Sequence, residues 1–460
     1  MTLIDPDLPD PLTLAEYAPG EAAVLSDAER WPTLDDTAAQ RLAHWRSHLD
    51  APQWTHATGD RLTAEQIDRV QKPLPPGDWL SEHLAAARRT LRYRDMPADA
   101  ALGEYPTISR ADLVEDIGAF VPLDADLERM LHGTSSGSTG AALLIPDDVE
   151  EVARGFHLLV ALAASAGVSV EPAGERLAVA NLVFQRQAFT YVSVISSFAH
   201  RAMARLNLHP SCWSTPGARE RYLADADPQI LSGHPTSLAE LVDSGLCEVL
   251  HPRVIFSGAM ALSAPLRRRL EDTFGCPVFD VFGLHETRPI AVRLDDGPFR
   301  VLQRRVHVEV LDEQGDPLPD GVMGEITVTA GENPLLPLVR YRTGDFARCV
   351  RLDDGGIGLA DLEGRENTMF RAGNGMLIPC VELTQQLQAH GALGWSVSQS
   401  ADGAVHASIA GGDADAVRTA LEALLGMPIR LTAVARLAEL GEGKPRRYRS
   451  EAAVSSGSAR

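Results

Sequence analysis

The stretch RVIFSGAMALSAPLRRRLEDTFGCPVFDVFG, residues 253–283, decides the predicted fold. It begins with an apolar run, continues with a segment whose apolar residues recur at helical spacing, and ends with a second apolar run. A strand, a helix and a strand in this order are typical of two parallel strands joined by a crossover helix. The same alternation precedes it, with LAVANLVF (177–184) as a short apolar run and VSVISSFAHRAMARL (192–206) as a helical segment. The middle of the chain therefore predicts an α/β fold with a largely parallel sheet covered by helices.

Downstream of Arg304 the apolar residues alternate with polar ones. VHVEVLD (306–312) and GEITVTA (324–330) flank a loop that contains Gly, Asp and Pro, which predicts a β-hairpin. The C-terminal part predicts a small α+β unit, with strands in 395–400, 404–411 and 429–437 and a helix in 413–426. We therefore expect an N-terminal cap segment (1–75), a large core domain with mixed and parallel sheets and a hairpin-rich part (76–366), and a small C-terminal domain (367–460).

The composition excludes several classes of function. With 42 Lys and Arg against 63 Asp and Glu, the formal charge is −21, which repels nucleic acids and anionic lipid surfaces. No apolar stretch is long enough to cross a membrane, and the acidic N-terminus has no signal-peptide pattern. The five cysteines are far apart and lack metal-binding spacing, which predicts reduced thiols and a cytoplasmic location.

A loop rich in small residues, HGTSSGSTGAA (132–142), contributes nothing to a core. Its glycines leave the backbone free to direct several N–H groups toward one point, which favours an anion. A flexible surface loop would have the same composition. The P-loop of nucleotide triphosphatases is excluded, because that motif needs a Lys where this chain has Ala141.

Four further segments contain charged residues beside glycine. DVFGLHE (280–286) would place Glu286 at the carboxyl edge of a parallel sheet, where ligands bind, although an acid that starts a helix would look the same. RYRTGDF (340–346) offers a carboxylate that can accept two hydrogen bonds from a vicinal diol. EGREN (363–367) lies where the two domain patterns meet, and GEGKPRRYR (441–449) is either a functional loop or a solvated basic tail.

The order of these motifs resembles that of the adenylate-forming superfamily, which includes acyl-CoA synthetases, the adenylation domains of peptide synthetases, and luciferases. Within it the chain is most similar to the phenylacetate-CoA ligase branch. The segments that carry this likeness are YPTISRADLVEDIGAF (105–120), SGHPTSLAEL (232–241) and SGAMALSAPLRRRLEDTFGCPVFDVFGLHE (257–286), and the likeness extends from about Gly77 to Arg449. It implies a large domain and a small, mobile C-terminal lid.

The resemblance also implies roles for individual residues. The loop would wrap the β- and γ-phosphates of ATP. Glu286 would hold Mg²⁺, Asp345 would bind the ribose hydroxyls, and Arg365 would approach the ribose or the α-phosphate. Lys444 would bridge the substrate carboxylate and the α-phosphate, with Asn367 as the hinge and Gly373 along the thiol tunnel. The nucleotide-binding residues implied are Ser135, Ser136, Gly137, Ser138, Thr139 and Gly140 in the loop, and Gly258, Ala259, Asp280, Phe282 and Gly283 around the adenine.

The chain departs from the family pattern at three positions. Ala141 replaces the Lys after the phosphate loop, Met260 replaces an expected acid, and His285 replaces the Ser or Thr before the Glu. His285 could contact the carboxylate substrate or the α-phosphate as a catalytic group, or it could be a packing residue. No cysteine stands near the hairpin for a structural zinc, so we expect no metal beyond magnesium.

The acyl pocket would form around Phe184, Gln185, Phe189 and His234, although these could equally be core residues. They suggest a small, ring-bearing acid with a polar substituent. The resemblance thus implies ATP-dependent adenylation of a small aromatic acid and transfer to the thiol of coenzyme A. Two alternatives stay open: delivery to a carrier protein, an amine or another nucleophile, and a nucleotide-binding protein that no longer turns over. We expect neither nucleic acid nor a membrane as a partner.

Overall fold

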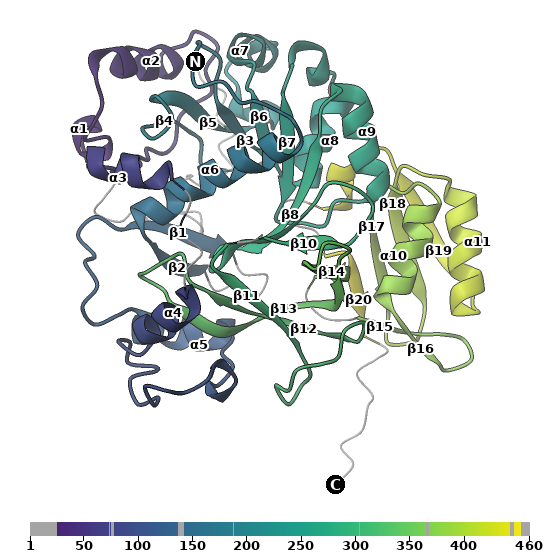
Figure 1. Cartoon of the computed structure of the whole chain (residues 1–460). Coiled ribbons are helices and arrows are strands. Elements are labelled where there is room, and N and C mark those ends of the chain that lie inside the picture. The colour runs from purple at the N-terminus through teal and green to yellow at the C-terminus, as the bar shows by residue number, and fades with distance from the viewer. Residues whose placement is uncertain are drawn as a thin grey trace.

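The computed structural model of the chain describes residues 25–72, 74, 78–136, 142–186, 188–302, 304–364, 368–441 and 446–451. One large sheet forms the centre of the molecule (Figure 1). In the described residues it has twelve strands, in the order β11-β12-β13-β14-β10-β9-β8-β7-β6-β3-β5-β4. The predicted α/β fold class is confirmed.

One half of this sheet is mainly parallel. Strands β5, β3, β6, β7 and β8 run parallel to one another, and β4 lies antiparallel to β5 at the outer edge. Because parallel strands end at the same side of a sheet, the loops that follow them share one edge. The strands are β3 (Val179–Val183), β4 (Tyr191–Ile195), β5 (Arg201–Asn207), β6 (Ile230–Gly233), β7 (Val254–Gly258) and β8 (Val278–Leu284).

Helices cover both faces of the parallel half, because its strands alternate between two cores. Ile255 faces a core shared with α2, α7, α8 and α9, whereas its neighbours Val254 and Phe256 face a core shared with α6. The stretch 253–283 folds as β7, α9 and β8, as predicted. The prediction of a helix in 192–206 is wrong, because this segment forms the antiparallel strands β4 and β5. The helices are α2 (Asp36–Arg46), α6 (Val149–Ser165), α7 (Ala218–Ala226), α8 (Pro235–Asp243) and α9 (Ala264–Phe274).

The other half of the sheet is antiparallel. The predicted hairpin of 306–312 and 324–330 is confirmed as β11 and β12, with Val308 opposite Val328. Strand β8 pairs with β9 in the antiparallel sense, so the β8–β9 pair joins the two halves of the sheet. The remaining strands are β9 (Arg288–Arg293), β10 (Phe299–Val301), β11 (Val306–Leu311), β12 (Met323–Ala330), β13 (Leu338–Arg351) and β14 (Ile357–Glu363).

The N-terminal region packs against this sheet in two places. Trp31 and Leu42 are fully buried, and the Trp31 indole donates to the Val194 carbonyl of β4 at 3.1 Å, so this segment is packed more tightly than its composition suggests. Further along, α4 and α5 pack with a two-stranded hairpin, β1 and β2, over β13. The elements are α1 (Asp27–Arg30), α3 (Ala64–Val70), α4 (Trp79–Ala87), α5 (Arg110–Asp116), β1 (Leu131–Ser136) and β2 (Ala142–Asp147).

The C-terminal residues form a second sheet with its own core. Its four strands run in the order β19-β18-β17-β20, and α10 and α11 pack on them (Figure 1). The predicted boundary at 366/367 lies outside the described residues, so the division into domains stays a prediction. The elements are β15 (Met369–Arg371), β16 (Leu377–Pro379), α10 (Cys380–Ala389), β17 (Gly394–Gln399), β18 (Val405–Ala410), α11 (Ala414–Leu425), β19 (Ile429–Val434) and β20 (Tyr448–Ser450).

Short 3-10 turns connect several of these elements, at Leu102–Glu104, Ile117–Phe120, Pro210–Cys212, Leu246–Val249 and Leu437–Leu440. Of the helices in the described ranges, none combines the length and the apolar character that crossing a bilayer requires.

Candidate active site

The predicted residues from separate motifs meet at the carboxyl edge of the parallel strands. Phe184 follows β3, His234 follows β6, and Gly258 ends β7. The register places Leu182 beside Gly233, Gly233 beside Ser257, and Gly258 beside Val281. The edge therefore brings candidate acyl-pocket and candidate adenine residues side by side, as expected for a ligand site in a parallel sheet.

The end of β7 is a strained turn. Ala259 has φ +64°, a left-handed conformation that costs free energy for a residue with a side chain. A Cβ at Gly258 would lie 3.5 Å from the Val281 carbonyl oxygen, so the chain passes close to β8 here. Residues in such conformations gather at ligand sites. The role of Gly258 and Ala259 beside an adenine stays a prediction.

Asp280 is a buried carboxylate with a partner on the adjacent strand. It lies opposite Arg293 of β9, whose Nη2 donates to its Oδ2 at 2.8 Å. The Arg293 guanidinium also stacks 4.4 Å from the centre of the Phe299 ring. Burial raises the pKa of Asp280 to about 6, against the lowering effects of Arg293 and Arg447. Asp280 is therefore held in an ion pair with Arg293, and its place in the adenine slot stays a prediction.

The turn that carries Glu286 joins two antiparallel strands, β8 and β9. Glu286 is therefore not an acid at the start of a helix, which was the alternative interpretation of its motif. It is buried, and Nη1 of Arg110 donates to its Oε1 at 2.7 Å. Arg110 comes from α5, far away in sequence, and is a site residue that the motif analysis missed.

Two buried carboxylates, Asp147 and Glu151, support this turn. Arg288, which has φ +59°, contacts Asp147 at the end of β2 at 2.6 Å and Glu151 of α6 at 2.9 Å. Nε2 of His285 lies 3.3 Å from Oδ2 of Asp147. Burial raises the pKa of Glu151, opposed by the charge of Arg288. The turn is thus tied to the β1–β2 hairpin, in which residues 132–136 and 142 of the predicted Gly/Ser/Thr loop are strand residues.

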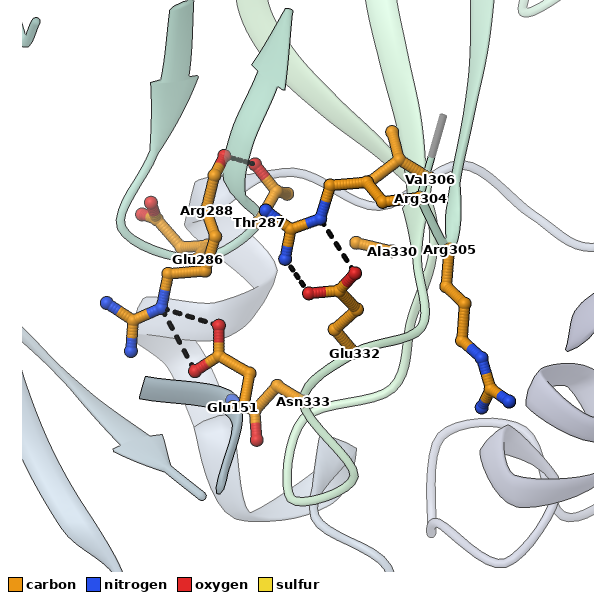
Figure 2. A pocket seen from close by; sticks show the side chains of 10 residues that line it. All are labelled: Glu151, Glu286, Thr287, Arg288, Arg304, Arg305, Val306, Ala330, Glu332 and Asn333. Atoms are coloured by element: carbon orange, nitrogen blue, oxygen red, sulfur yellow. Dashed lines mark hydrogen bonds and ion pairs between the residues drawn. The ribbon is translucent and has the colours of Figure 1, made fainter. Parts of the chain in front are cut away.

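A small cavity lies on the inner side of the same turn (Figure 2). Its volume of about 10 Å³ gives room for a single water molecule. Figure 2 shows two ion pairs beside it, Arg288 with Glu151 and Arg304 with Glu332. Burial lowers the pKa of Arg304 to about 10. Because acids and bases pair here, this cavity offers no net charge to a second ligand.

Asp345 lies in a turn within β13 that its neighbours hold in place. Gly344 has φ +77° and donates its N–H to Oε1 of Glu325 at 3.0 Å, and the N–H of Asp345 donates to Oγ1 of Thr343 at 3.1 Å. A Cβ at Gly364 would lie 3.5 Å from Oδ1 of Asp345. The carboxylate therefore lies close to the chain that leads to Arg365.

The predicted acyl-pocket residues divide into two groups. Phe184, Gln185 and His234 lie at the ends of the neighbouring strands β3 and β6. Phe189 lies farther out, where Arg205 stacks 4.1 Å from its ring centre and the His56 ring centre is 5.4 Å away. Only the first group is adjacent to the strand ends of the candidate adenine site.

Two buried contacts shape the first group. The amide of Asn207, a residue that sequence analysis missed, donates to the Gln185 carbonyl at 2.7 Å, and its Oδ1 accepts from the Gln185 N–H at 3.2 Å. Nδ1 of His234 accepts from the Ser237 N–H at 3.3 Å at the start of α8. In the neutral imidazole the proton therefore belongs on Nε2, which makes that atom a donor.

The C-terminal unit touches the loop that follows the candidate adenine turn. Nη2 of Arg447 donates to the Ala261 carbonyl at 2.6 Å, and its guanidinium lies 4.4 Å from the Trp395 ring centre. Oγ of Ser263 donates to the Leu393 carbonyl at 2.7 Å. Arg447 thus lies beside the loop that follows the candidate adenine turn.

Close packing against the chain at Gly426 explains why residue 373 is a glycine. Its N–H donates to the Leu425 carbonyl at 2.8 Å, and a Cβ there would lie 2.5 Å from the Gly426 carbonyl oxygen. Its predicted place along a thiol tunnel is not tested by this contact.

Several predicted residues are outside what the structure describes. These are Gly137, Ser138, Thr139, Gly140, Arg365, Asn367 and Lys444, together with the side chains of Ser135 and Ser136 in β1. Their roles stay predictions.

The candidate metal site consists of one carboxylate. The described part of the chain contains no group of three or more His, Cys, Asp or Glu that could hold a metal ion. Mg²⁺ in nucleotide sites commonly uses one or two carboxylates and takes its other ligands from phosphates and water. The single buried carboxylate of Glu286 fits such an ion.

Comparison with known proteins agrees with these features. Residues 153–333 match the family model described as AMP-binding enzyme. Phenylacetate-coenzyme A ligase of Pseudomonas putida is 31% identical over 139 residues, which are 28% of this chain and 31% of that enzyme. Phenylacetate-coenzyme A ligase of Aromatoleum evansii is 23% identical over 64% of this chain and 68% of that enzyme. The chain thus aligns with less than a third of the first relative's length.

Among solved structures, the chain resembles a 2-hydroxyisobutyryl-CoA ligase in complex with an acyl-AMP. The TM-score is 0.56, the identity 16%, and the alignment covers 83% of this chain and 88% of that one. At this identity the likeness concerns the fold.

Proposed function

We propose that this chain is an adenylate-forming AMP-binding enzyme, which activates a small aromatic carboxylic acid with ATP and transfers the acyl group to the thiol of coenzyme A. One observation carries the proposal. The buried carboxylate of Glu286 is presented by a fixed turn at the same sheet edge where β7 ends in the strained Gly258–Ala259 turn. A carboxylate can hold the cation of a metal-bound triphosphate, and ligands of parallel sheets bind at this edge.

The first step makes the acid reactive. A carboxylate oxygen attacks the α-phosphorus of ATP, the bond from that phosphorus to the bridging oxygen breaks, and pyrophosphate leaves. The product is a mixed anhydride whose leaving group is AMP. Because the transition state spreads negative charge, its stabilisation depends on positive charge and placement.

The chain's own residues would supply the placement and much of the charge. Lys444 would bridge the carboxylate and the α-phosphate, and Asp345 would hold the ribose hydroxyls. A Mg²⁺ ion on Glu286 would supply positive charge to the phosphate oxygens. In the second step the thiolate of coenzyme A attacks the acyl carbon, and AMP leaves with the electrons of the broken bond.

The aromatic character of the acid is supported by the relatives' names and by the first acyl-pocket group. Phe184 offers an apolar wall, and Nε2 of His234 offers a donor for a polar group. Pyrophosphate exchange into ATP, measured with benzoate, phenylacetate, hydroxybenzoates and the aliphatic 2-hydroxyisobutyrate, tests the first step. We expect exchange with at least one aromatic acid and formation of its coenzyme A thioester, detected by mass.

A matched pair of variants assigns the activity to this site. Asp345→Asn should raise the KM for ATP. Asp361→Asn, on the neighbouring strand β14, removes a half-exposed acid that pairs with Arg348 at 3.0 Å, and should leave that KM unchanged. Exchange with none of the acids, or equal effects of the two substitutions, would overturn the proposal. An adenylate that forms but is not passed to coenzyme A would favour a carrier protein or an amine as the acceptor.

A further inference from the structure

The ion pair of Arg110 and Glu286 joins two distant parts of the chain at the candidate metal site. Its N–O distance is 2.7 Å, and the side chains are 18% and 5% exposed. A carboxylate so far removed from water needs a positive partner, because an unpaired buried charge is strongly destabilising. In this structure that partner is Arg110.

The backbone around Arg110 is fixed by the same strand that carries Asp345. The N–H of Ile108 donates to the Arg340 carbonyl at 3.1 Å, and the N–H of Arg342 donates to the Ile108 carbonyl at 2.7 Å. Ser109 then starts α5, with its N–H and hydroxyl bonded to Asp112 at 2.8 Å. Arg110 is the first residue of that helix, so a rigid segment presents it to Glu286.

The other arginines near the turn have acidic partners of their own. Arg288 pairs with Asp147 and Glu151, and Arg304 pairs with Glu332. Among the described residues, Arg110 is the cation within ion-pair distance of Glu286. A metal ion that takes this carboxylate must therefore compete with Arg110.

We propose that Arg110 is an exchangeable counter-ion of Glu286, which neutralises the carboxylate in the ligand-free protein and releases it to Mg²⁺ when the cation arrives with ATP. This inference rests on the proposed function. The guanidinium stays charged at every physiological pH, so it can bind the phosphates that arrive with the cation. Free Mg²⁺ brings no such anion, so the exchange favours the nucleotide-bound ion.

Binding of Mn²⁺, followed by its electron paramagnetic resonance signal with and without ATP, tests the exchange independently of catalysis. Arg110→Gln should bind free Mn²⁺ at least about tenfold more tightly than the parent, because a charged hydrogen bond no longer competes. The same substitution should weaken binding of the Mn²⁺–ATP complex by about tenfold. Arg92→Gln is the matched control and should change neither affinity. Arg92 lies 3.9 Å from Asp112, which is on the same helix as Arg110.

Two further variants keep the result decisive. Arg110→Gln/Glu286→Gln should lose the gain in free Mn²⁺ binding, which assigns the gain to Glu286. Arg110→Lys keeps the charge, so it should fold even where Arg110→Gln does not, and should lie between the parent and Arg110→Gln. Equal affinities of parent and Arg110 variants for free Mn²⁺ would overturn the inference. Failure of the proposed function would show instead as absent pyrophosphate exchange, whatever the Mn²⁺ affinities.

Discussion

The imidazole of His285 occupies the space that a side chain at Gly133 would need: a Cβ on Gly133 would lie 2.2 Å from Cε1 of His285. Gly133 belongs to β1 and to the predicted Gly/Ser/Thr loop, and His285 immediately precedes Glu286. The same ring contacts Asp147, at the end of the other strand of that hairpin. His285 therefore packs the turn of Glu286 against the β1–β2 hairpin. This geometry favours a positioning role over direct catalysis, and a catalytic role for His285 stays a prediction.

Gly133→Ala should displace the His285 ring and break its contact with Asp147. We expect the free energy of unfolding to fall by about 1–3 kcal/mol, as for other overpacked sites. His285→Ala in the same chain should restore most of the loss. Gly155→Ala in α6 is the control, since nothing lies within 4 Å of its Cβ, and helix propensity predicts unchanged or higher stability. Denaturant unfolding measures all four proteins, and equal losses for the two glycine variants would contradict the packing described.

Arg293→Ala should destabilise the protein in a pH-dependent manner. Because burial raises the pKa of Asp280 from 3.8 to about 6, the stability this carboxyl contributes is fully present below pH 3.8 and is lost as the pH rises through 6. Without Arg293 the ionised carboxylate has lost its closest partner, so the loss at pH 8 should reach about 3–5 kcal/mol and be much smaller at pH 5. Unfolding at the two pH values checks this.

The double variant Arg293→Ala/Asp280→Asn serves as the control for that experiment. It should show no extra loss between pH 5 and pH 8, because no carboxyl is left to titrate. A loss of the same size at both pH values for Arg293→Ala alone would mean that the pair acts through packing on Phe299 and not through charge.

Asn207→Leu should damage the acyl pocket and leave the nucleotide site intact. The substitution removes both hydrogen bonds that fix the Gln185 backbone, so the KM for the acid should rise by about tenfold or more while the KM for ATP stays within about twofold. Steady-state kinetics with the best acid measures both constants. A parallel rise of the two would show that Asn207 serves the fold as a whole.

Arg447→Ala should loosen the C-terminal unit from the loop after β7. The change removes a charged hydrogen bond to the Ala261 carbonyl and a stacking contact with Trp395, together about 2–4 kcal/mol. Hydrogen exchange should accelerate at residues 258–264 and little elsewhere in the large sheet. Arg449→Ala, in the strand β20 that follows Arg447, is the matched comparison. Unchanged exchange in 258–264 would mean that Ser263 and Leu393 hold the two units together without Arg447.

The sequence was sufficient for the parts of the fold that depend on local periodicity. The strand, helix and strand of 253–283 and the hairpin of 306–312 and 324–330 were predicted because the apolar spacing is regular there. The direction of β9 was not predicted, because the sequence RPIAVR does not indicate which strand it pairs with. That direction decides that Glu286 lies in a turn between strands and not at the start of a helix.

The candidate site was predictable only where a motif carried it. Glu286 and Asp345 stand beside glycines at strand ends and were found from that pattern. Arg110, Arg293 and Asn207 act through partners that are distant along the chain or on a neighbouring strand, and pairing of this kind leaves no local signal. For Arg110 a partial signal existed, because Ser109 and Asp112 form a capping box that marks the start of a helix.

The most direct test of the central claim is a single-turnover reaction with ATP labelled at the α-phosphate, an aromatic acid and no coenzyme A. The account predicts that the parent protein accumulates about one acyl-adenylate per site and releases pyrophosphate, whereas Lys444→Ala binds ATP but forms adenylate at least about a hundredfold more slowly. Release of ADP in place of AMP, or adenylate formation at the parental rate in Lys444→Ala, would contradict it.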